Sequence, residues 1–209
     1  MPDLERPRLL VVAGPNGSGK TTVTERGLRH EWFHGCEYVN PDNIARDVFG
    51  DWNSPDAVLK AATEADRRRK HAIASRQDLA FETVFSARDK VTFVYDALDA
   101  GYFVRLFFVG TAEPSINAAR VARRVQQGGH DVPITKIIDR YVKSIANCAE
   151  VALDVDRLYL YDNSVDGADP RLVLRASKGS VTRRYGPTPE WMLPIAGALH
   201  ADDGGGSLP

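Results

Sequence analysis

The chain has 209 residues, of which 43% are hydrophobic and 26% charged, and a net charge of -1, values typical of a single globular domain. The balance of 27 basic and 28 acidic residues argues against a protein that coats nucleic acid, while leaving local charged patches open. Because no apolar run approaches the length of a membrane span, the two cysteines lack metal or redox spacing and no secretion signal is present, we expect a soluble cytoplasmic protein.

The first motif in the chain follows the apolar run Leu9–Ala13, which predicts a buried strand. The next eight residues fit G-x-x-x-x-G-K-[ST] at every fixed position: Gly14-Pro15-Asn16-Gly17-Ser18-Gly19-Lys20-Thr21. In such a loop, backbone N–H groups and the following helix, here expected over 20–29, bind phosphates. Lys20 would reach the β- and γ-phosphates, and the Thr21 hydroxyl would ligate Mg²⁺. We therefore predict a site for ATP and Mg²⁺ formed by residues 14–21 and the adjacent Thr22.

Strand-like and helix-like segments alternate through the rest of the chain, which favours a parallel sheet with crossover helices. Further strands are expected over 37–40, 79–85, 103–109, 157–161 and 171–174. Further helices are expected from Pro55 to about Gln77, from a capping box at Ser86 and Asp89 to Gly101, and over 113–127 and 133–150. We predict an α/β phosphate-loop fold with a mostly parallel sheet of five to six strands. It would form a single domain over 1–185, followed by a C-terminal extension over 186–209 with a flexible, glycine-rich tail.

Two carboxylates lie at the ends of expected strands, where ligands bind in open α/β sheets. Asp42 follows the strand over 37–40, and Glu82 lies near the end of the strand over 79–85. Phosphoryl transfer needs a group that accepts the proton of the attacking hydroxyl, and Asp42 is our candidate base; a turn or cap residue after Pro41 is the alternative. Glu82 stands among apolar residues, where a carboxylate needs a partner such as an arginine, a metal-bound water or a substrate hydroxyl. Exposure on an edge strand is its alternative.

Three arginines of the helix over 113–127 share one face, because Arg120, Arg123 and Arg124 are spaced i, i+3 and i+4. They are candidates to clamp the triphosphate, with a solvated basic face as the alternative. The turn Gly128-Gly129-His130-Asp131 favours the clamp, since such a hinge can open and close over a nucleotide. A second basic run, Arg67-Arg68-Arg69-Lys70, circles a long helix and is expected to be solvated surface.

A competing motif occurs at His30-Glu31-Trp32-Phe33-His34, which fits the zinc-binding pattern H-E-x-x-H. A catalytic zinc site needs a third protein ligand, but the sequence has no G-x-x-H continuation and few other histidines. The segment also lies just before Gly35, at the end of the expected helix. A surface turn is therefore the better interpretation.

Taken together, these motifs resemble the zeta-toxin family of phosphate-loop kinases over about residues 8–175. The resemblance rests on the phosphate loop, Asn40-Pro41-Asp42, Phe81-Glu82-Thr83, the three arginines, residues 128–133 and Tyr161-Asp162-Asn163-Ser164. It implies a Mg²⁺-dependent kinase; better-known members phosphorylate a hydroxyl of UDP-N-acetylglucosamine and are restrained by an antitoxin. By motif, Lys20 and Thr21 would bind ATP and Mg²⁺, with Asp42 as the base and Glu82 on the substrate. Arg120 with Arg124 or Arg123 would contact phosphates.

One departure from the family concerns Val84, which stands where a substrate-contacting threonine is usual. The acceptor therefore remains open between a UDP-sugar and another hydroxylated metabolite. A small-molecule kinase is the favoured function. A 5′-polynucleotide or tRNA kinase is one alternative and would need a basic, salt-sensitive groove. A regulatory nucleotide-binding ATPase is the other, and it would hydrolyse ATP without an acceptor.

Overall fold

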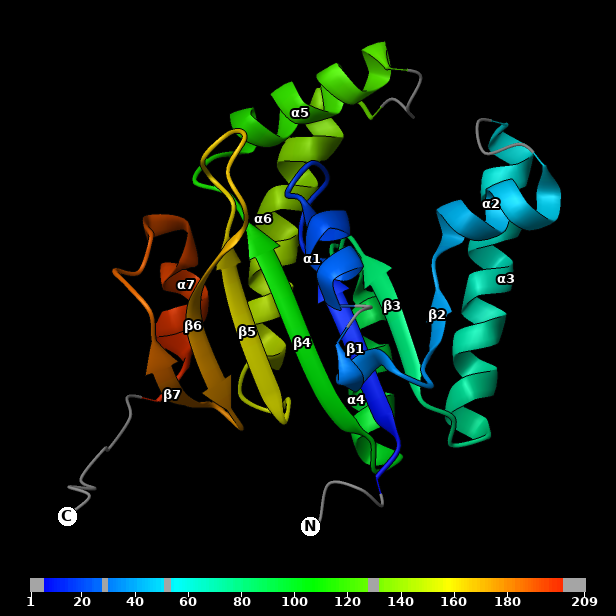
Figure 1. The fold of residues 1–209 in the computed structure, drawn as a ribbon, viewed down its shortest axis with the longest axis horizontal. Coiled ribbons are helices and arrows are strands. Elements are labelled where there is room, and N and C mark those ends of the chain that lie inside the picture. The colour runs from blue at the N-terminus through cyan, green and yellow to red at the C-terminus, as the bar shows by residue number, and fades with distance from the viewer. Residues whose placement is uncertain (1–5, 28–29, 51–53, 128–131, 201–209) are drawn as a thin grey trace.

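The computed structural model describes residues 6–27, 30–50, 54–127 and 132–200, and within them helices flank a seven-stranded sheet (Figure 1). The strands are β1 (Arg8–Ala13), β2 (Glu37–Val39), β3 (Leu79–Thr83), β4 (Phe103–Gly110), β5 (Arg157–Asp162), β6 (Arg171–Ser177) and β7 (Ser180–Arg184). Their order across the sheet is β2-β3-β1-β4-β5-β6-β7. The first five strands in this order are parallel, and β6 and β7 add an antiparallel hairpin. The predicted α/β fold is confirmed, but the strand count was too low because β7 was not predicted.

The helices are α1 (Lys20–Gly27), α2 (Pro41–Phe49), α3 (Pro55–Ala74), α4 (Arg88–Asp99), α5 (Pro114–Gln126), α6 (Ile134–Val151) and α7 (Leu193–Ala198). Helix α2 was not predicted, although Asn40 caps it by accepting a hydrogen bond from the Asp42 N–H at 2.8 Å, and Pro41 opens it. The predicted capping box of α4 is wrong. That helix begins after Ala87, which makes no side-chain cap bond.

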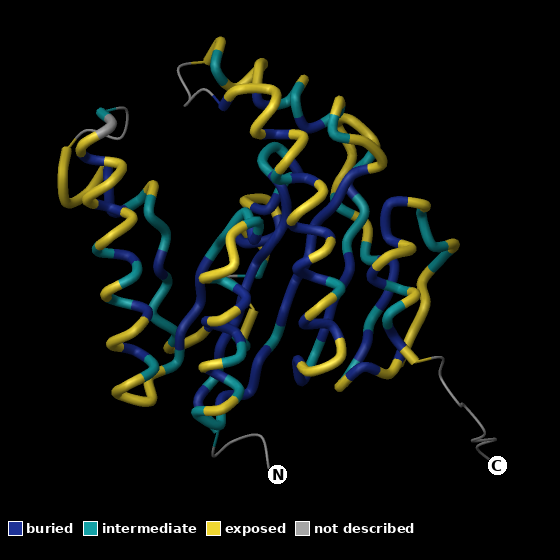
Figure 2. Tube along the Cα trace, turned by 180° about the vertical axis from the view of Figure 1, so that it is seen from behind, coloured by how far each residue is buried: buried dark blue, intermediate teal, exposed yellow. Residues whose placement is uncertain are grey.

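The core lies mainly on one face of the sheet, where α4, α6 and α7 pack (Figures 1 and 2). Alternate residues of the central strands point into it, among them Leu106 and Phe108 of β4 and Leu158 and Leu160 of β5. The opposite face carries a smaller cluster that includes Phe107 and Tyr159. Its cover is α1 and a 3₁₀ turn over Glu31–Phe33. The two faces of the sheet are therefore unequally covered.

The described part of the predicted extension contributes to the main core. Trp191, Met192 and Ile195, in the 3₁₀ turn Glu190–Met192 and α7, are buried, and α7 packs against α6. The boundary at residue 185 remains a prediction, and the glycine-rich tail lies outside the described residues. Within the described ranges, no helix is both long and apolar enough to cross a bilayer.

Candidate functional site

The phosphate-loop motif joins β1 to α1 as a tight turn at the carboxyl edge of the sheet (Figure 1). Gly17 and Gly19 adopt positive φ angles of 74° and 92°, which side chains disfavour. A Cβ on Gly17 would lie 2.5 Å from the Asn117 carbonyl oxygen, and one on Gly19 would lie 2.2 Å from Asn163 Nδ2. The glycines are thus required both by backbone conformation and by close neighbours.

Side chains from three later elements hold the loop. Asn117 of α5 donates from Nδ2 to the Asn16 carbonyl oxygen at 2.6 Å, and Asn163, after β5, donates to the Ser18 carbonyl oxygen at 2.8 Å. Arg140 of α6 donates to Asn16 Oδ1 at 3.1 Å. The contacts of Asn117 and Arg140 were missed from the sequence, which carries no spacing signal for residues about a hundred positions away.

Lys20 is buried and donates to the Pro15 carbonyl oxygen at 3.0 Å. Burial lowers the pKa of its ammonium group, the charges of Glu82 and Asp42 raise it, and the charge of Arg124 lowers it. These three predicted site residues are therefore close enough to act electrostatically on Lys20. A buried cation under the electrostatic influence of carboxylates and an arginine is expected where a polyphosphate binds.

Glu82 is half-buried on β3 and lies opposite Val12 of β1, while the pairing of β3 with β2 ends one residue earlier, at Phe81. It accepts a hydrogen bond from Thr24 Oγ1 of α1 at 3.0 Å. Tyr38 lies beside it: burial and the charge of Glu82 raise the pKa of Tyr38 to about 12. The Tyr38 hydroxyl accepts a hydrogen bond from Asn40 Nδ2 at 3.1 Å. Thr24 and Tyr38 were not singled out in the sequence, since neither belongs to the loop motif.

Asp42 lies in the first turn of α2 with its side chain exposed. The same Asn40 that contacts Tyr38 also caps this helix through the Asp42 N–H. Asn40 therefore connects Asp42 with Tyr38, the neighbour of Glu82. Thr21 and Thr22, in the first turn of α1, are also exposed.

The three arginines of α5 make different contacts. Arg120 donates to the carbonyl oxygens of Asn163 at 2.9 Å and Val165 at 3.3 Å, so it holds the segment that follows β5. Arg123 pairs with Asp166 at 3.0 Å. Arg124 acts on Lys20, as described above. The predicted hinge at 128–131 lies outside the described residues.

Two other motifs can now be placed. The competing zinc motif contains the 3₁₀ turn Glu31–Phe33, which His30 caps by accepting a hydrogen bond at Nδ1 from the Trp32 N–H at 3.2 Å, in agreement with the expected turn. Within the described ranges no group of three or more potential metal-ligating side chains occurs. The basic run of α3 is solvated except for Arg69, which is 3% exposed and lies over the Phe81 ring. The prediction for Arg69 is therefore wrong, because its helical position faces the sheet.

Fold and loop together define a phosphate-loop nucleotide-binding protein of the α/β class. The sequence matches the zeta toxin family over residues 1–167, and the chain belongs to this family of ATP-binding kinases. A relative from Haemophilus influenzae, described as an uncharacterized protein, is 26% identical over 134 residues, 64% of this chain and 92% of its own.

Solved structures show the same fold. A chain of the AvrRxo1-ORF1:ORF2 complex with ATP is 17% identical and has a TM-score of 0.64, with 85% of this chain and 60% of that one covered. The PezAT toxin-antitoxin system of Streptococcus pneumoniae gives 16% identity and a TM-score of 0.59, with 82% and 71% covered. This chain thus spans about 60% of the length of the AvrRxo1 chain that it matches.

Proposed function

We propose that the protein transfers the γ-phosphate of ATP to a hydroxyl group of a small molecule, with UDP-N-acetylglucosamine as the first candidate acceptor. The observation that carries the proposal is the buried Lys20 of the phosphate loop, whose pKa responds to the charges of Glu82, Arg124 and Asp42, together with Glu82 held by Thr24 of the helix that follows the loop. A simple nucleotide switch needs the loop but not two carboxylates at the acceptor side. The ATP bound in the AvrRxo1 complex supports the choice of donor.

In the proposed reaction, the oxygen of the acceptor hydroxyl forms a bond to the γ-phosphorus of ATP, and Asp42 accepts the proton of that hydroxyl. The bond between the γ-phosphorus and the oxygen that remains on ADP breaks. Lys20 and Arg124 offset the negative charge of the transferring phosphoryl group. Glu82, oriented by Thr24, would bind the acceptor. Because Thr24 fixes its position, Glu82 is better suited to orienting the acceptor than to exchanging hydrogen-bond partners during the reaction.

Mg²⁺ fits the residues present. The exposed Thr21 hydroxyl and the carboxylates of Glu82 and Asp42, whose charges act on the neighbouring Lys20, are oxygen ligands of the kind this ion prefers. When bound, Mg²⁺ would neutralise charge on the β- and γ-phosphates. In this proposal Thr21 holds the ion, and the backbone around Gly17 and Gly19 holds the phosphates.

The proposal includes a protein partner. AvrRxo1-ORF1 was solved together with ORF2, and PezAT is described as a toxin-antitoxin system. We infer that this chain, too, is controlled by a second protein. Co-purification with the product of an adjacent gene, followed by loss of kinase activity in the complex, would support this part of the proposal.

The test compares Asp42→Asn with Asp47→Asn, an exposed carboxylate of the same helix that pairs with Arg46. Each protein is incubated with ATP, Mg²⁺ and a panel of acceptors that includes UDP-N-acetylglucosamine, other hydroxylated metabolites and a 5′-hydroxyl oligonucleotide. We expect a phosphorylated small molecule by mass spectrometry, with kcat on the order of 10²-fold lower in Asp42→Asn and unchanged in the control. ADP formation without any phosphorylated acceptor would contradict the kinase proposal, and a labelled oligonucleotide alone would replace it with a polynucleotide kinase.

A further inference from the structure

We propose that an arginine-covered area on the open side of the sheet binds single-stranded nucleic acid. This arginine face consists of Arg105 of β4, Arg157 of β5, Arg175 of β6 and Arg183 of β7. It lies on the α1 side of the sheet, away from α4, α6 and α7. The inference does not depend on the proposed kinase reaction.

The first observation is the missing helical layer. Parallel strands are normally covered on both faces, yet in Figure 1 the described helices leave β4, β5 and β6 in open view, and α1 lies over β1. On this side the described contacts of α1 are with β1, β3 and β4. In the part of the chain that the structure describes, α1 and the 3₁₀ turn over Glu31–Phe33 cover Phe107 and Tyr159, and the arginines of β4 to β7 lie half-buried or exposed beside this cover.

The second observation is the pairing of like charges. Arg105 lies directly opposite Arg157 in the β4–β5 register, and Arg175 lies directly opposite Arg183 in the β6–β7 register. Like charges in directly opposed positions destabilise a sheet. No described carboxylate forms an ion pair with any of these four arginines, although sixteen ion pairs form elsewhere among the described residues. An anion placed across the strands would offset this repulsion.

The third observation is that aromatic rings fix the guanidinium groups. Arg105 lies 4.4 Å from the Phe103 ring centroid and 4.9 Å from that of Trp32. Arg175 lies 5.3 Å from the Tyr159 ring, and Arg183 lies 5.0 Å from the ring of Tyr185. Such contacts orient the arginines without neutralising them. The charges are therefore held in place before any ligand arrives.

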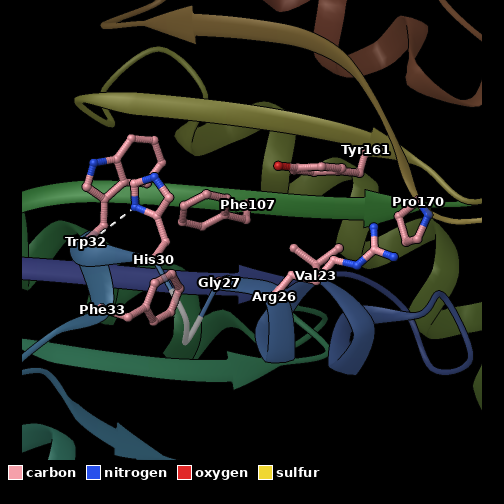
Figure 3. Close-up of a pocket in the computed structure, with 9 residues that line it drawn as sticks. All are labelled: Val23, Arg26, Gly27, His30, Trp32, Phe33, Phe107, Tyr161 and Pro170. Atoms are coloured by element: carbon pink, nitrogen blue, oxygen red, sulfur yellow. Dashed lines mark hydrogen bonds between the residues drawn. The ribbon is translucent and has the colours of Figure 1, made fainter.

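An apolar pocket of about 190 Å³ adjoins this face (Figure 3). Its walls include Trp32, Phe33, Phe107 and Tyr161, and Phe107 is stacked on Tyr159 with ring centroids 4.8 Å apart. Trp32 lines the pocket and also contacts Arg105 of the arginine face, so it connects the two. A planar ring that enters the pocket would thus be attached to a group that reaches the arginines.

These features together favour a nucleic acid over an acidic protein segment. Four neighbouring strands distribute the charges over roughly 15 Å, a line suited to successive phosphates, and the aromatic pocket is suited to a base. Single-strand binding proteins combine positive charge with aromatic stacking in this way. An acidic peptide would use the charges and leave the pocket unexplained.

The test measures fluorescence anisotropy of a labelled 12-nucleotide single-stranded RNA with the full chain, with and without saturating ATP. We expect binding that ATP does not displace, with a log–log salt slope of about -2 to -3 for four neutralised charges. An abasic oligomer of the same length should bind several-fold more weakly, because it cannot fill the pocket. A duplex RNA and a polyglutamate peptide complete the set of probes.

Two variants and a control test whether RNA binds at the arginine face. Arg157→Ser combined with Arg175→Ser should weaken binding at least tenfold, and the exposed Arg183→Ser should do so several-fold while keeping the thermal unfolding curve of the wild type. Arg184→Ser is the control, since Arg184 follows Arg183 on β7 and contacts Thr188. Absence of RNA binding, equal loss in Arg184→Ser, or polyglutamate binding as tight as RNA would each overturn the proposal, the last in favour of an acidic protein partner.

Discussion

A buried ammonium group is costly, and Lys20 carries one at the end of the phosphate loop. Its lowered pKa records that cost, which the neighbouring carboxylates only partly offset. Such a group is tolerated where a polyanion binds, because the cation is then paired. In the proposed site, Lys20 would thus contribute to phosphate binding at the expense of the stability of the free protein.

We therefore predict that Lys20→Met abolishes phosphoryl transfer without destabilising the fold. Activity should fall by on the order of 10²-fold or more, while the midpoint of thermal unfolding stays equal or rises. Circular dichroism and a turnover assay measure the two effects. Lys143→Met, which removes an exposed lysine paired with Asp139, is the control; turnover within a few-fold of wild type in Lys20→Met would contradict the role assigned to the loop.

Cys36 offers a second measurement at this scale. Burial raises the pKa of its thiol from 9.0 to about 11, so at pH 8 the reactive thiolate is on the order of a hundredfold rarer than in the unfolded chain. Alkylation by iodoacetamide should be correspondingly slower in the native protein and should keep rising with pH above 9. Mass spectrometry of a Cys148→Ser variant isolates this site, and a native rate that levels off below pH 9 would show that the pKa is not raised.

At the scale of elements, the N-terminus of helix α2 combines a stabilising cap, Asn40, with the candidate base Asp42. Its cap residue Asn40 also contacts Tyr38, which lies beside Glu82. The helix places Asp42, the candidate base, in its first turn. Losing the cap should therefore affect both the helix and the orientation of Asp42.

We predict that Asn40→Ala costs about 1 kcal/mol of unfolding free energy and lowers kcat several-fold, whereas Asn40→Asp restores much of the stability. Ser54→Ala is the matched control. Ser54 caps α3 by accepting from the Ala57 N–H at 3.0 Å, so its loss should cost similar stability with no change in kcat. Denaturant titration measures the loss of stability, and steady-state kinetics measures kcat. An equal fall of kcat in Asn40→Ala and Ser54→Ala would contradict the role of Asn40 in orienting Asp42.

The elements also show what the sequence could predict. Strong apolar runs such as Leu9–Ala13 and the loop motif determine the strands and the first helix, and these predictions agree with the structure. Helix α2 was missed because no helix was predicted after Pro41, where Asp42 was interpreted as a candidate base at the end of a strand. Strand β7 was missed because Ser180–Arg184 is mostly polar. Contacts such as Asn117 with Asn16 depend on how helices pack, which local spacing does not encode.

At the scale of the whole molecule, the C-terminal segment completes the main core. Trp191, Met192 and Ile195 are at most 7% exposed. Burial of three such side chains stabilises a protein by roughly 5 to 8 kcal/mol as an upper estimate. That is comparable with the total stability of many domains.

We predict that a chain ending at Pro189 is insoluble or unfolded at 37 °C, whereas a chain ending at His200 unfolds within a few degrees of the full-length protein. Thermal unfolding followed by circular dichroism distinguishes the two. A stable, cooperatively folding product that ends at Pro189 would support the domain boundary expected near residue 185 and would contradict the contribution assigned to the segment.

Two hydrogen bonds at the end of β5 connect the C-terminal segment, residues 190–199, with the phosphate loop. Trp191 donates to Asp162 at 2.9 Å, and the next residue, Asn163, donates to the phosphate loop at Ser18. Linked equilibria are reciprocal, so a nucleotide that fixes the loop would also tighten the attachment of the C-terminal helix. Sequence changes in residues 190–199 would then alter nucleotide affinity without contacting the nucleotide. Selection on the phosphate loop would act on the C-terminal segment as well, and the reverse also holds.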